Sequence, residues 1–292
     1  MGTVLLEAVI TGILTGSIYA LMASGLTLIY GVMEIINIAQ GILVILGAYL
    51  SYALEQYLHI DLFLGLLITM PLLFLLGVGI ERMALRRLNR TGNSLSILVM
   101  FAVALIIEGV LSYLFGTNYI QLQAWYIDAS FQVGHFYVAY IYAFACVLSL
   151  LLLAGLYVLV YCTKFGYGLR ASMQNRTAAQ LIGIDVEKIS TITFGIGISL
   201  AAAGGVAFGA TNAFNPASSY DLISRLLVII VMGGMGSLLG AFLAAILMLV
   251  IGDVTAVAWS PVWSSTIFFL MLVVLLVVRP QGLFGQSEVR KQ

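Results

Sequence analysis

Few residue types in this 292-residue chain could do chemistry, and those that could lie within or beside long apolar runs. Glu108 stands inside the apolar run Ser94–Phe115. A carboxylate is costly inside a membrane, so its presence there indicates a functional role, or else a structural hydrogen bond to a neighbouring helix. Asn37, Gln40 and Gly41 form a polar patch between two apolar runs. The patch could be an ordinary loop, or it could present amides and free backbone groups to a polar solute.

The residue types that most enzymes use are scarce. The chain has only three lysines, and none follows the Gly-x-x-x-x-Gly pattern of a phosphate-binding loop, so we expect no ATP hydrolysis by this chain alone. The two histidines, His59 and His135, fall at predicted helix ends, without a serine or second histidine at catalytic or metal-binding spacing. We therefore expect no catalytic residue, no metal and no cofactor in this chain, and an intramembrane enzyme is disfavoured.

The elements that must position these residues follow from composition. The chain is 62% hydrophobic and 8% charged, with mean hydropathy +1.13, whereas soluble domains are about 45–50% apolar and about 25% charged. Continuously apolar runs of this length predict an all-α, polytopic transmembrane helix bundle of about eight segments, because barrel strands would alternate apolar and polar residues. The expected segments are Leu5–Tyr30, Gly41–Leu58, Leu62–Ile80, Ser94–Phe115, Phe136–Cys162, Ile189–Asn212, Leu222–Gly252 and Trp263–Val278. No linker divides residues 1–292, which we take as a single transmembrane domain.

Basic residues predict the orientation, because Lys and Arg stay on the cytoplasmic side. They cluster at 82–90, at 164–188 and at 279–291, which places these segments and the C-terminus inside and the N-terminus outside. An even number of crossings must then separate Lys188 from Arg279, although three apolar runs lie between them. We expect Leu222–Gly252 to be the broken or re-entrant run, because three glycines interrupt it. These are Gly233, Gly234 and Gly236. Polar breaks after Gly31 and after Asn212 are compatible with two related halves.

The longest polar segment on the predicted cytoplasmic side runs over residues 163–189. Leu169, Met173, Leu181 and Ile182 can share one face of a short helix, and Gly183 can end that helix as a C-cap. Such an amphipathic helix must pack on something. We expect it either to pack on its own protein or to dock on a cytoplasmic partner.

The sequence resembles the permeases of ABC importers for branched-chain amino acids, nearly from end to end. Five segments carry the resemblance: 25–33 (GLTLIYGVM), 37–41 (NIAQG), 170–184 (RASMQNRTAAQLIGI), 233–237 (GGMGS) and 279–285 (RPQGLFG). The resemblance implies a subunit in the bacterial inner membrane that passes on hydrophobic amino acids. Its partners would be a second, related permease, two cytoplasmic ATPase subunits that bind ATP and Mg, and an extracytoplasmic solute-binding protein.

The resemblance also assigns roles to residues of this chain. It implies that the segment 163–189 holds a helix that sits in a groove of the ATPase. The residues expected there are Gly166, Gly168, Arg170, Ala178, Ala179 and Gly183. We expect Asn37, Gln40, Gly41 and Glu108 near the solute pathway. Glu34, Gln40 and Ile42 depart from the family pattern near the pathway, which leaves a wider amino-acid specificity, urea or a short amide open as the solute. Thr177 departs from the pattern in the docking loop, which weakens one docking contact without removing the helix. An autonomous channel or secondary transporter that uses Glu108 is the alternative from another class.

Overall fold

The apolar runs form a bundle of long helices in the computed structural model, which describes residues 2–86, 93–123, 129–133, 136–279 and 281–284. The described helices are α1 (Gly2–Met33), α2 (Gln40–Leu58), α3 (Leu62–Ile80) with a π-helical turn η1 (Glu81–Leu85), α5 (Asn93–Phe115), α6 (Tyr140–Cys162), α7 (Lys164–Gln174), α8 (Arg176–Leu181), α9 (Val186–Thr211), α10 (Ser218–Gly233), α11 (Leu238–Ala258) and α12 (Pro261–Val278). Strands β1 (Ser130–Val133) and β2 (Phe136–Ala139) form an antiparallel hairpin before α6.

The predicted fold class is confirmed. Among the described residues, eight helices are long and apolar enough to cross a membrane. Seven of them coincide closely with expected segments. The eighth, α11, is the second half of the run that we expected to be broken. That run forms two helices, because α10 ends at Gly233 and α11 begins at Leu238. The 16-residue α10 is too short to count as a full crossing.

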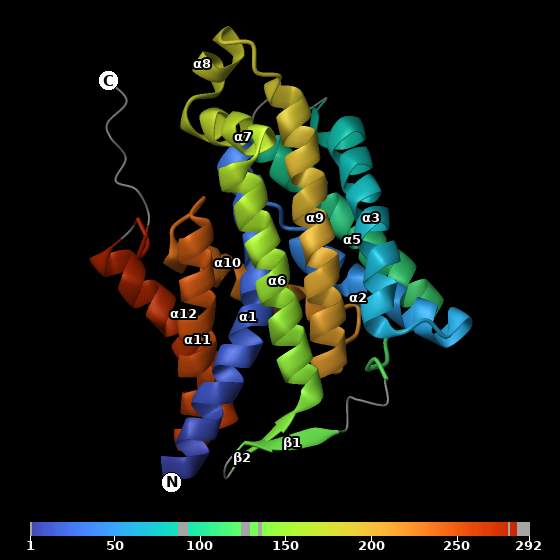
Figure 1. Cartoon of the computed structure of the whole chain (residues 1–292), viewed down its shortest axis with the longest axis vertical. Helices are drawn as coiled ribbons and strands as arrows, with labels where there is room; N and C mark the ends of the chain where they lie inside the picture. The colour runs from blue at the N-terminus through green and yellow to red at the C-terminus, as the bar shows by residue number, and fades with distance from the viewer. Residues whose placement is uncertain (1, 87–92, 124–128, 134–135, 280, 285–292) are drawn as a thin grey trace.

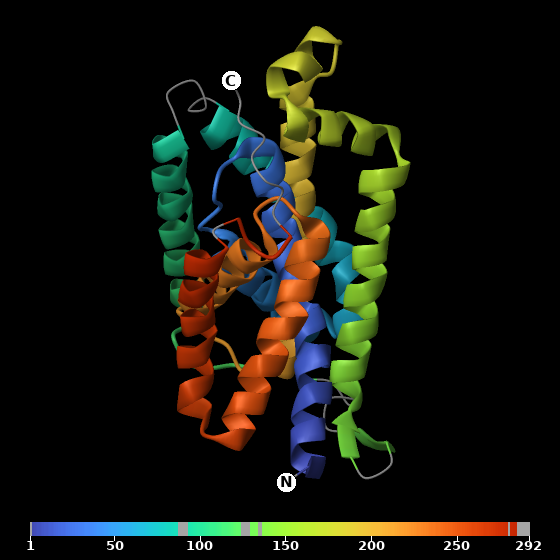
Figure 2. The same cartoon turned by 90° about the vertical axis from the view of Figure 1, so that its left-hand side faces the viewer.

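The bundle has two distinct ends (Figures 1 and 2). One, here the loop end, carries α7 and α8, the end of α1 and the π-helical turn. The other, the hairpin end, carries β1, β2 and the start of α1. The start of α1 and the loop 163–185 therefore lie at opposite ends, as the distribution of basic residues predicts. Helices α9, α10, α11 and α12 lead from Lys188 to Arg279, and the shorter α10 supplies the return between the full-length α9 and α11.

The two central helices, α1 and α9, cross at two glycines. A methyl group on Gly25 would overlap the carbonyl oxygen of Gly197, and one on Gly197 would lie 2.7 Å from the carbonyl oxygen of Gly25. The contact is reciprocal, so each helix presents the same small residue to the other. Membrane helices gain nothing from excluding lipid tails and rely on such close packing.

Other glycines also allow close helix packing. Gly12 and Gly16 of α1 lie against the backbone of α11 at Val250 and Ile246. Gly205 of α9 lies against the carbonyl group of Val44 in α2. The many small residues of these helices therefore allow the helix backbones to pack closely against one another.

Two halves of the chain repeat one arrangement in opposite directions. In each half a long helix ends in a polar break and is followed by a helix that starts inside the molecule, as Figure 2 shows for α1–α2 and α9–α10. The third helix of each half packs on the long helix of the other: α11 on α1, and α3 on α9. Helices α2 and α10 meet where Gly41 touches the carbonyl group of Ser219. This agrees with the two-half pattern suggested by the breaks.

The crossing at Gly25 and Gly197 yields a stability prediction. In Gly25→Val the added side chain meets the backbone of α9, and overpacking of this kind costs about 1–3 kcal/mol. We expect a clear fall in the melting temperature of the detergent-purified protein. Gly155→Ala is the matched control, because nothing lies within 4 Å of a Cβ at Gly155. Equal melting temperatures for the two variants would contradict the packing described here.

Candidate functional site

The polar patch after α1 is sealed inside the bundle. Asn37 and Gln40 are fully buried. The Nδ2 of Asn37 donates to the Oε1 of Gln40 at 3.1 Å, and the Nε2 of Gln40 donates to the carbonyl oxygen of Gly197 at 3.4 Å. The two amides thus tie the start of α2 to the crossing of α1 and α9. None of this patch reaches solvent in this conformation, so its place on a solute pathway stays a prediction.

Glu108 lies instead on the outer surface of the described chain. It stands seven residues before the end of α5, about 10 Å along the helix axis, among exposed apolar neighbours such as Ile106. The hydroxyl group of Tyr220 in α10 donates to the Oε2 of Glu108 at 2.6 Å. This hydrogen bond joins α5 to the first turn of α10.

A charged pair that the sequence reasoning missed lies on α10 directly after Tyr220. The Nε of Arg225 lies 2.9 Å from the Oδ2 of Asp221, and their side chains are 26% and 62% exposed. The guanidinium carbon of Arg225 also lies 5.9 Å from the ring centroid of Phe268 in α12. The sequence does contain a signal for this pair, because Arg225 is the only basic residue between Lys188 and Arg279 and falls inside an apolar run.

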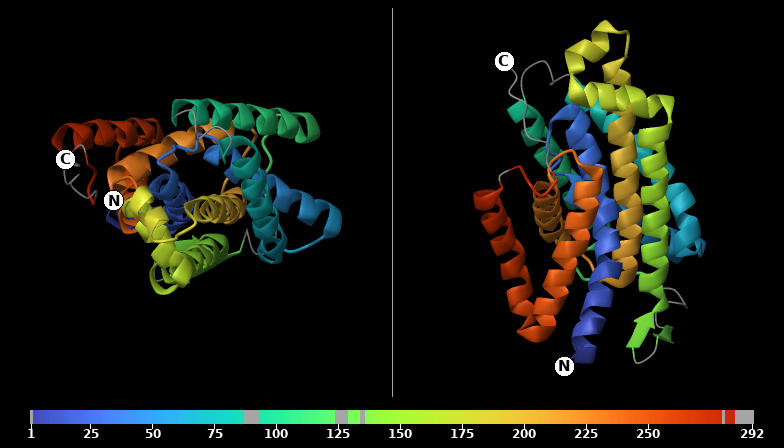
Figure 3. Two further views of the ribbon diagram at one scale, coloured as in Figure 1. Left: turned by 90° about the horizontal axis from the view of Figure 1, so that it is seen from above. Right: turned by 60° about the vertical axis from the view of Figure 1, so that its left-hand side comes forward.

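These groups share one face. The Oγ of Ser224 donates to the carbonyl oxygen of Tyr220 at 2.7 Å and completes the set. We call Glu108, Tyr220, Asp221, Ser224 and Arg225 the polar seam. Seen from above, α10 lies between α5 and α12 along one side of the molecule (Figure 3, left). The polar seam therefore lies on an outer face, with Tyr220 and Asp221 exposed and Glu108, Ser224 and Arg225 half-buried, in contrast to the sealed patch of Asn37 and Gln40.

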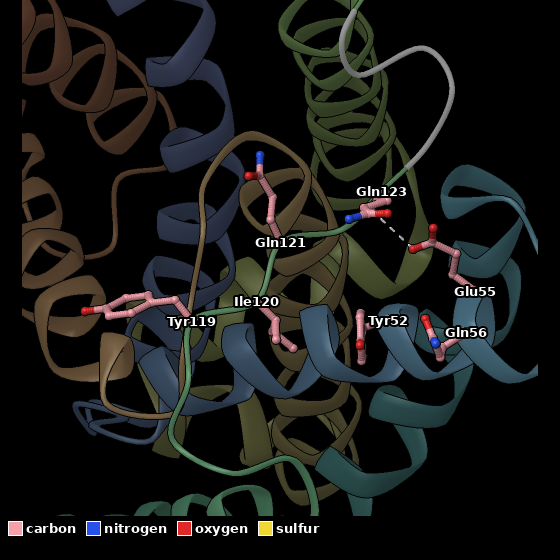
Figure 4. A pocket seen from close by; sticks show the side chains of 7 residues that line it. All are labelled: Tyr52, Glu55, Gln56, Tyr119, Ile120, Gln121 and Gln123. Carbon is pink, nitrogen blue, oxygen red and sulfur yellow. Dashed lines mark hydrogen bonds between the residues drawn. The ribbon is translucent and has the colours of Figure 1, made fainter.

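An outer pocket lies between α2 and the segment that follows α5. Its cavity volume is about 300 Å³. It is lined by Tyr52, Glu55, Gln56, Tyr119, Ile120, Gln121 and Gln123 (Figure 4). The carboxylate of Glu55 points toward Gln123 and accepts a hydrogen bond from its backbone N–H at 3.4 Å. The pocket is an open, polar hollow on the hairpin side, suited to hydrated polar groups.

The loop between α6 and α9 folds into two short helices rather than the single amphipathic helix expected. Asn175 separates them. Its Oδ1 accepts from the backbone N–H of Ala178 at 2.9 Å and so caps the start of α8. At the other end Gly183 has φ +87°, and the bonds Gly183 N to Gln180 O and Ile184 N to Ala179 O close a Schellman motif. The predicted C-cap at Gly183 is therefore confirmed.

The apolar residues of this loop do not share one face, which corrects our expectation. Leu169 is buried against the bundle, whereas Leu181 and Ile182 of the α8 tip are 84% and 75% exposed. The break at Asn175 separates Leu169 and Met173 of α7 from Leu181 and Ile182, because α8 points away from the bundle (Figure 1). Leu181 and Ile182 therefore form an exposed apolar tip beyond the membrane bundle.

Most loop residues that the resemblance singled out support this shape from within. A Cβ on Gly166 would overlap the backbone carbonyl groups at the end of α6, and one on Gly168 would lie 2.8 Å from the Cδ1 of Ile189. Ala179 is buried, whereas Ala178 is exposed. Arg170 lies 5.1 and 5.0 Å from the ring centroids of Tyr161 and Tyr167, as cation–π contacts require.

The broken segment is a tight turn beside this loop. Gly234 and Gly236 have positive φ, and Gly233 crosses Gly240 backbone to backbone. The side chain of Met173 in α7 fills the space between Gly31 of α1 and Gly236 of the turn. The loop, the end of α1 and the turn therefore meet at one methionine.

A second link joins the loop to α3. Glu81 is buried at the start of the π-helical turn, and the hydroxyl group of Thr191 in α9 donates to its Oε2 at 2.6 Å. Arg86 and Glu187 pair beside it. The first turns of α9 are thus held to the end of α3.

Comparison with known proteins identifies the family. The family described as "Branched-chain amino acid transport system / permease component" matches residues 8–276. The chain is 32% identical to the probable branched-chain amino acid transport permease protein LivH of Methanocaldococcus jannaschii, over 94% of this chain and 90% of that protein. It is 25% identical to the high-affinity LivH permease of Escherichia coli K12, over 98% and 97% of the two chains. It is 26% identical to the BraD permease of Pseudomonas aeruginosa, over 98% and 97%.

No solved structure matches the chain. The family match nevertheless covers the whole helical bundle from α1 to α12, including the loop of α7 and α8 and the turn at Gly233–Ser237. The chain belongs to the family of branched-chain amino acid transport permease components.

Proposed function

We propose that this chain is the membrane permease subunit of an ATP-binding-cassette importer for branched-chain or other hydrophobic amino acids. The observation that carries the proposal is the exposed apolar tip of α8, on a chain of this permease family. A permease without an ATPase motif needs its energy from a partner, and the α8 tip offers that partner a surface. The partners are two ATPase subunits, a second permease and an extracytoplasmic binding protein.

The proposal orients the chain in the plasma membrane. The loop end faces the cytoplasm, because Arg82, Arg86 and the basic residues of α7 and α8 gather there. The end of α12 lies inside with them. The binding protein then meets the hairpin end, on whose side the outer pocket lies.

A route for the mechanical signal follows from the contacts. Movement of α8 by the ATPase reaches α7, whose Met173 touches both the end of α1 and the turn between α10 and α11. The same movement reaches α3 through the start of α9, by the bonds to Glu81 and Arg86. The packed pairs α1–α11 and α3–α9, each of which combines one helix from either half, are thereby linked to α8, which is how a rocking change of access would begin.

The first experiment is affinity purification of the chain from its native membrane in mild detergent, followed by reconstitution. We expect an ATPase and a second permease to co-purify, and the complex to take up leucine into vesicles only with ATP and the binding protein. Uptake by the isolated chain without ATP would overturn the proposal and would favour a channel or secondary transporter that uses Glu108.

The α8 tip provides a direct test of docking. Leu181→Asp places a charge on the apolar tip and should lower ATP-driven uptake about tenfold or more, because loss of a contact residue at an interface costs about 2 kcal/mol or more. The amount of ATPase that co-purifies should fall with it. Gln174→Glu is the control, because it adds the same charge at an exposed position on α7. Full uptake by Leu181→Asp would exclude the tip as the docking surface.

Met173 tests the signal route separately from docking. Met173→Ala removes the side chain that fills the space between Gly31 and Gly236, so the ATPase should still bind and hydrolyse ATP while uptake per ATP falls several-fold. The ratio of leucine moved to phosphate released measures this. Met83→Ala, at an exposed methionine of the π-helical turn, should leave the ratio unchanged. An unchanged ratio in Met173→Ala would show that the signal takes another route.

A further inference from the structure

The polar seam is partly exposed at a position where lipid is an unsuitable neighbour. Asp221 and Arg225 lie on α10, whose other residues are mostly apolar and buried, and Glu108 lies on an α5 whose outward residues are apolar. Charged side chains cost about 2.5–3.5 kcal/mol each at the centre of a membrane-spanning helix. Hydrocarbon is therefore an unfavourable cover for this face, and we expect water or protein there.

The pairing within the polar seam leaves much of its hydrogen-bonding capacity unused. Among the described residues, Arg225 is ion-paired with Asp221 through its Nε, which leaves the two terminal nitrogens of the guanidinium for another acceptor. Those two nitrogens form a planar fork that matches a carboxylate. Asp221 is more than half exposed, and Glu108 has one carboxylate oxygen beyond the one that Tyr220 occupies.

This distribution of charge has the pattern of a zwitterion. An α-amino acid carries a carboxylate and an ammonium group on one carbon, so it needs a cation and an anion close together. Arg225 and Asp221 are adjacent turns of one helix, and Glu108 reaches the same turn through Tyr220. A protein partner that packed here would need only to neutralise the charges. A cation and an anion that both retain unused hydrogen-bonding capacity instead suit a solute that carries both charges.

We propose that the polar seam binds zwitterionic amino acids in a water-filled pathway, with Arg225 holding the carboxylate and Asp221 and Glu108 holding the ammonium group. The proposal rests on the proposed function, since it places the solute of that importer. The pathway then runs along the face of α5 and α10, where a second permease closes its other side. The sealed patch of Asn37 and Gln40 supports the packing behind it.

Accessibility to a charged thiol reagent tests the location. In a background with Cys146→Ala and Cys162→Ala, Ser224→Cys in the reconstituted complex should react with a membrane-impermeant charged methanethiosulfonate. Ile106→Cys, on the apolar exposed side of α5, should not react. Leucine should slow the reaction of Ser224→Cys, and leucinamide, which lacks the carboxylate, should protect about tenfold less well, the loss of a contact worth about 1.4 kcal/mol. An unreactive Ser224→Cys, or equal protection by both solutes, would overturn the proposal.

Substitution of Arg225 tests the chemistry. Arg225→Gln should raise the KM for leucine about tenfold or more, by the same conversion, while ATPase activity and recovery of the complex stay near wild-type. Arg225→Lys should restore part of the loss. A wild-type KM in Arg225→Gln would overturn the assignment. If Arg225→Gln fails to assemble, the thiol protection decides. Failure of wild-type complex to move leucine with ATP would instead overturn the proposed function, which separates the two.

Discussion

The fold depends on one crossing, where Gly25 of α1 and Gly197 of α9 bring two backbones into reciprocal contact. Both helices are long, and their central turns are buried on almost every side. Helices α3 and α11 pack on these two, and the carboxamide of Gln40 fixes the start of α2 against the carbonyl group of Gly197. Because packing holds membrane helices together, every other element takes its position from how closely these two approach.

The polar groups of the bundle fall into two kinds, and the difference lies in where their partners come from. The amides of Asn37 and Gln40 find each other and the backbone within the protein. The polar seam and the α8 tip instead face outward, one with charge inside an apolar face and the other with apolar side chains beyond the bundle. Charged groups are unfavourable in an apolar face, and large apolar side chains are unfavourable when they are exposed beyond the bundle. These are the two surfaces at which we propose that the solute and the ATPase act.

Much of the fold could be predicted from the sequence, because length and apolarity alone define a membrane helix. The eight spans, the break at Gly233–Ser237 and the C-cap at Gly183 follow from composition and glycine chemistry. The site was harder. Periodicity placed Leu169 and Leu181 on one face, yet a single capping side chain, Asn175, ends one helix and starts another. Arg225 went unweighed as a site residue because charge counts alone do not reveal that α10 lies on an outer face.

The contact of Met173 with Gly31 and Gly236 has a consequence for how this protein can change over evolutionary time. Three segments, more than 50 residues apart in the sequence, share one small volume. A larger residue at Gly31 leaves no space for the methionine, Gly236 has a positive φ that favours glycine, and a smaller residue at 173 leaves a void that only a gain elsewhere can fill. Substitutions at these three positions are therefore expected to occur together among related permeases.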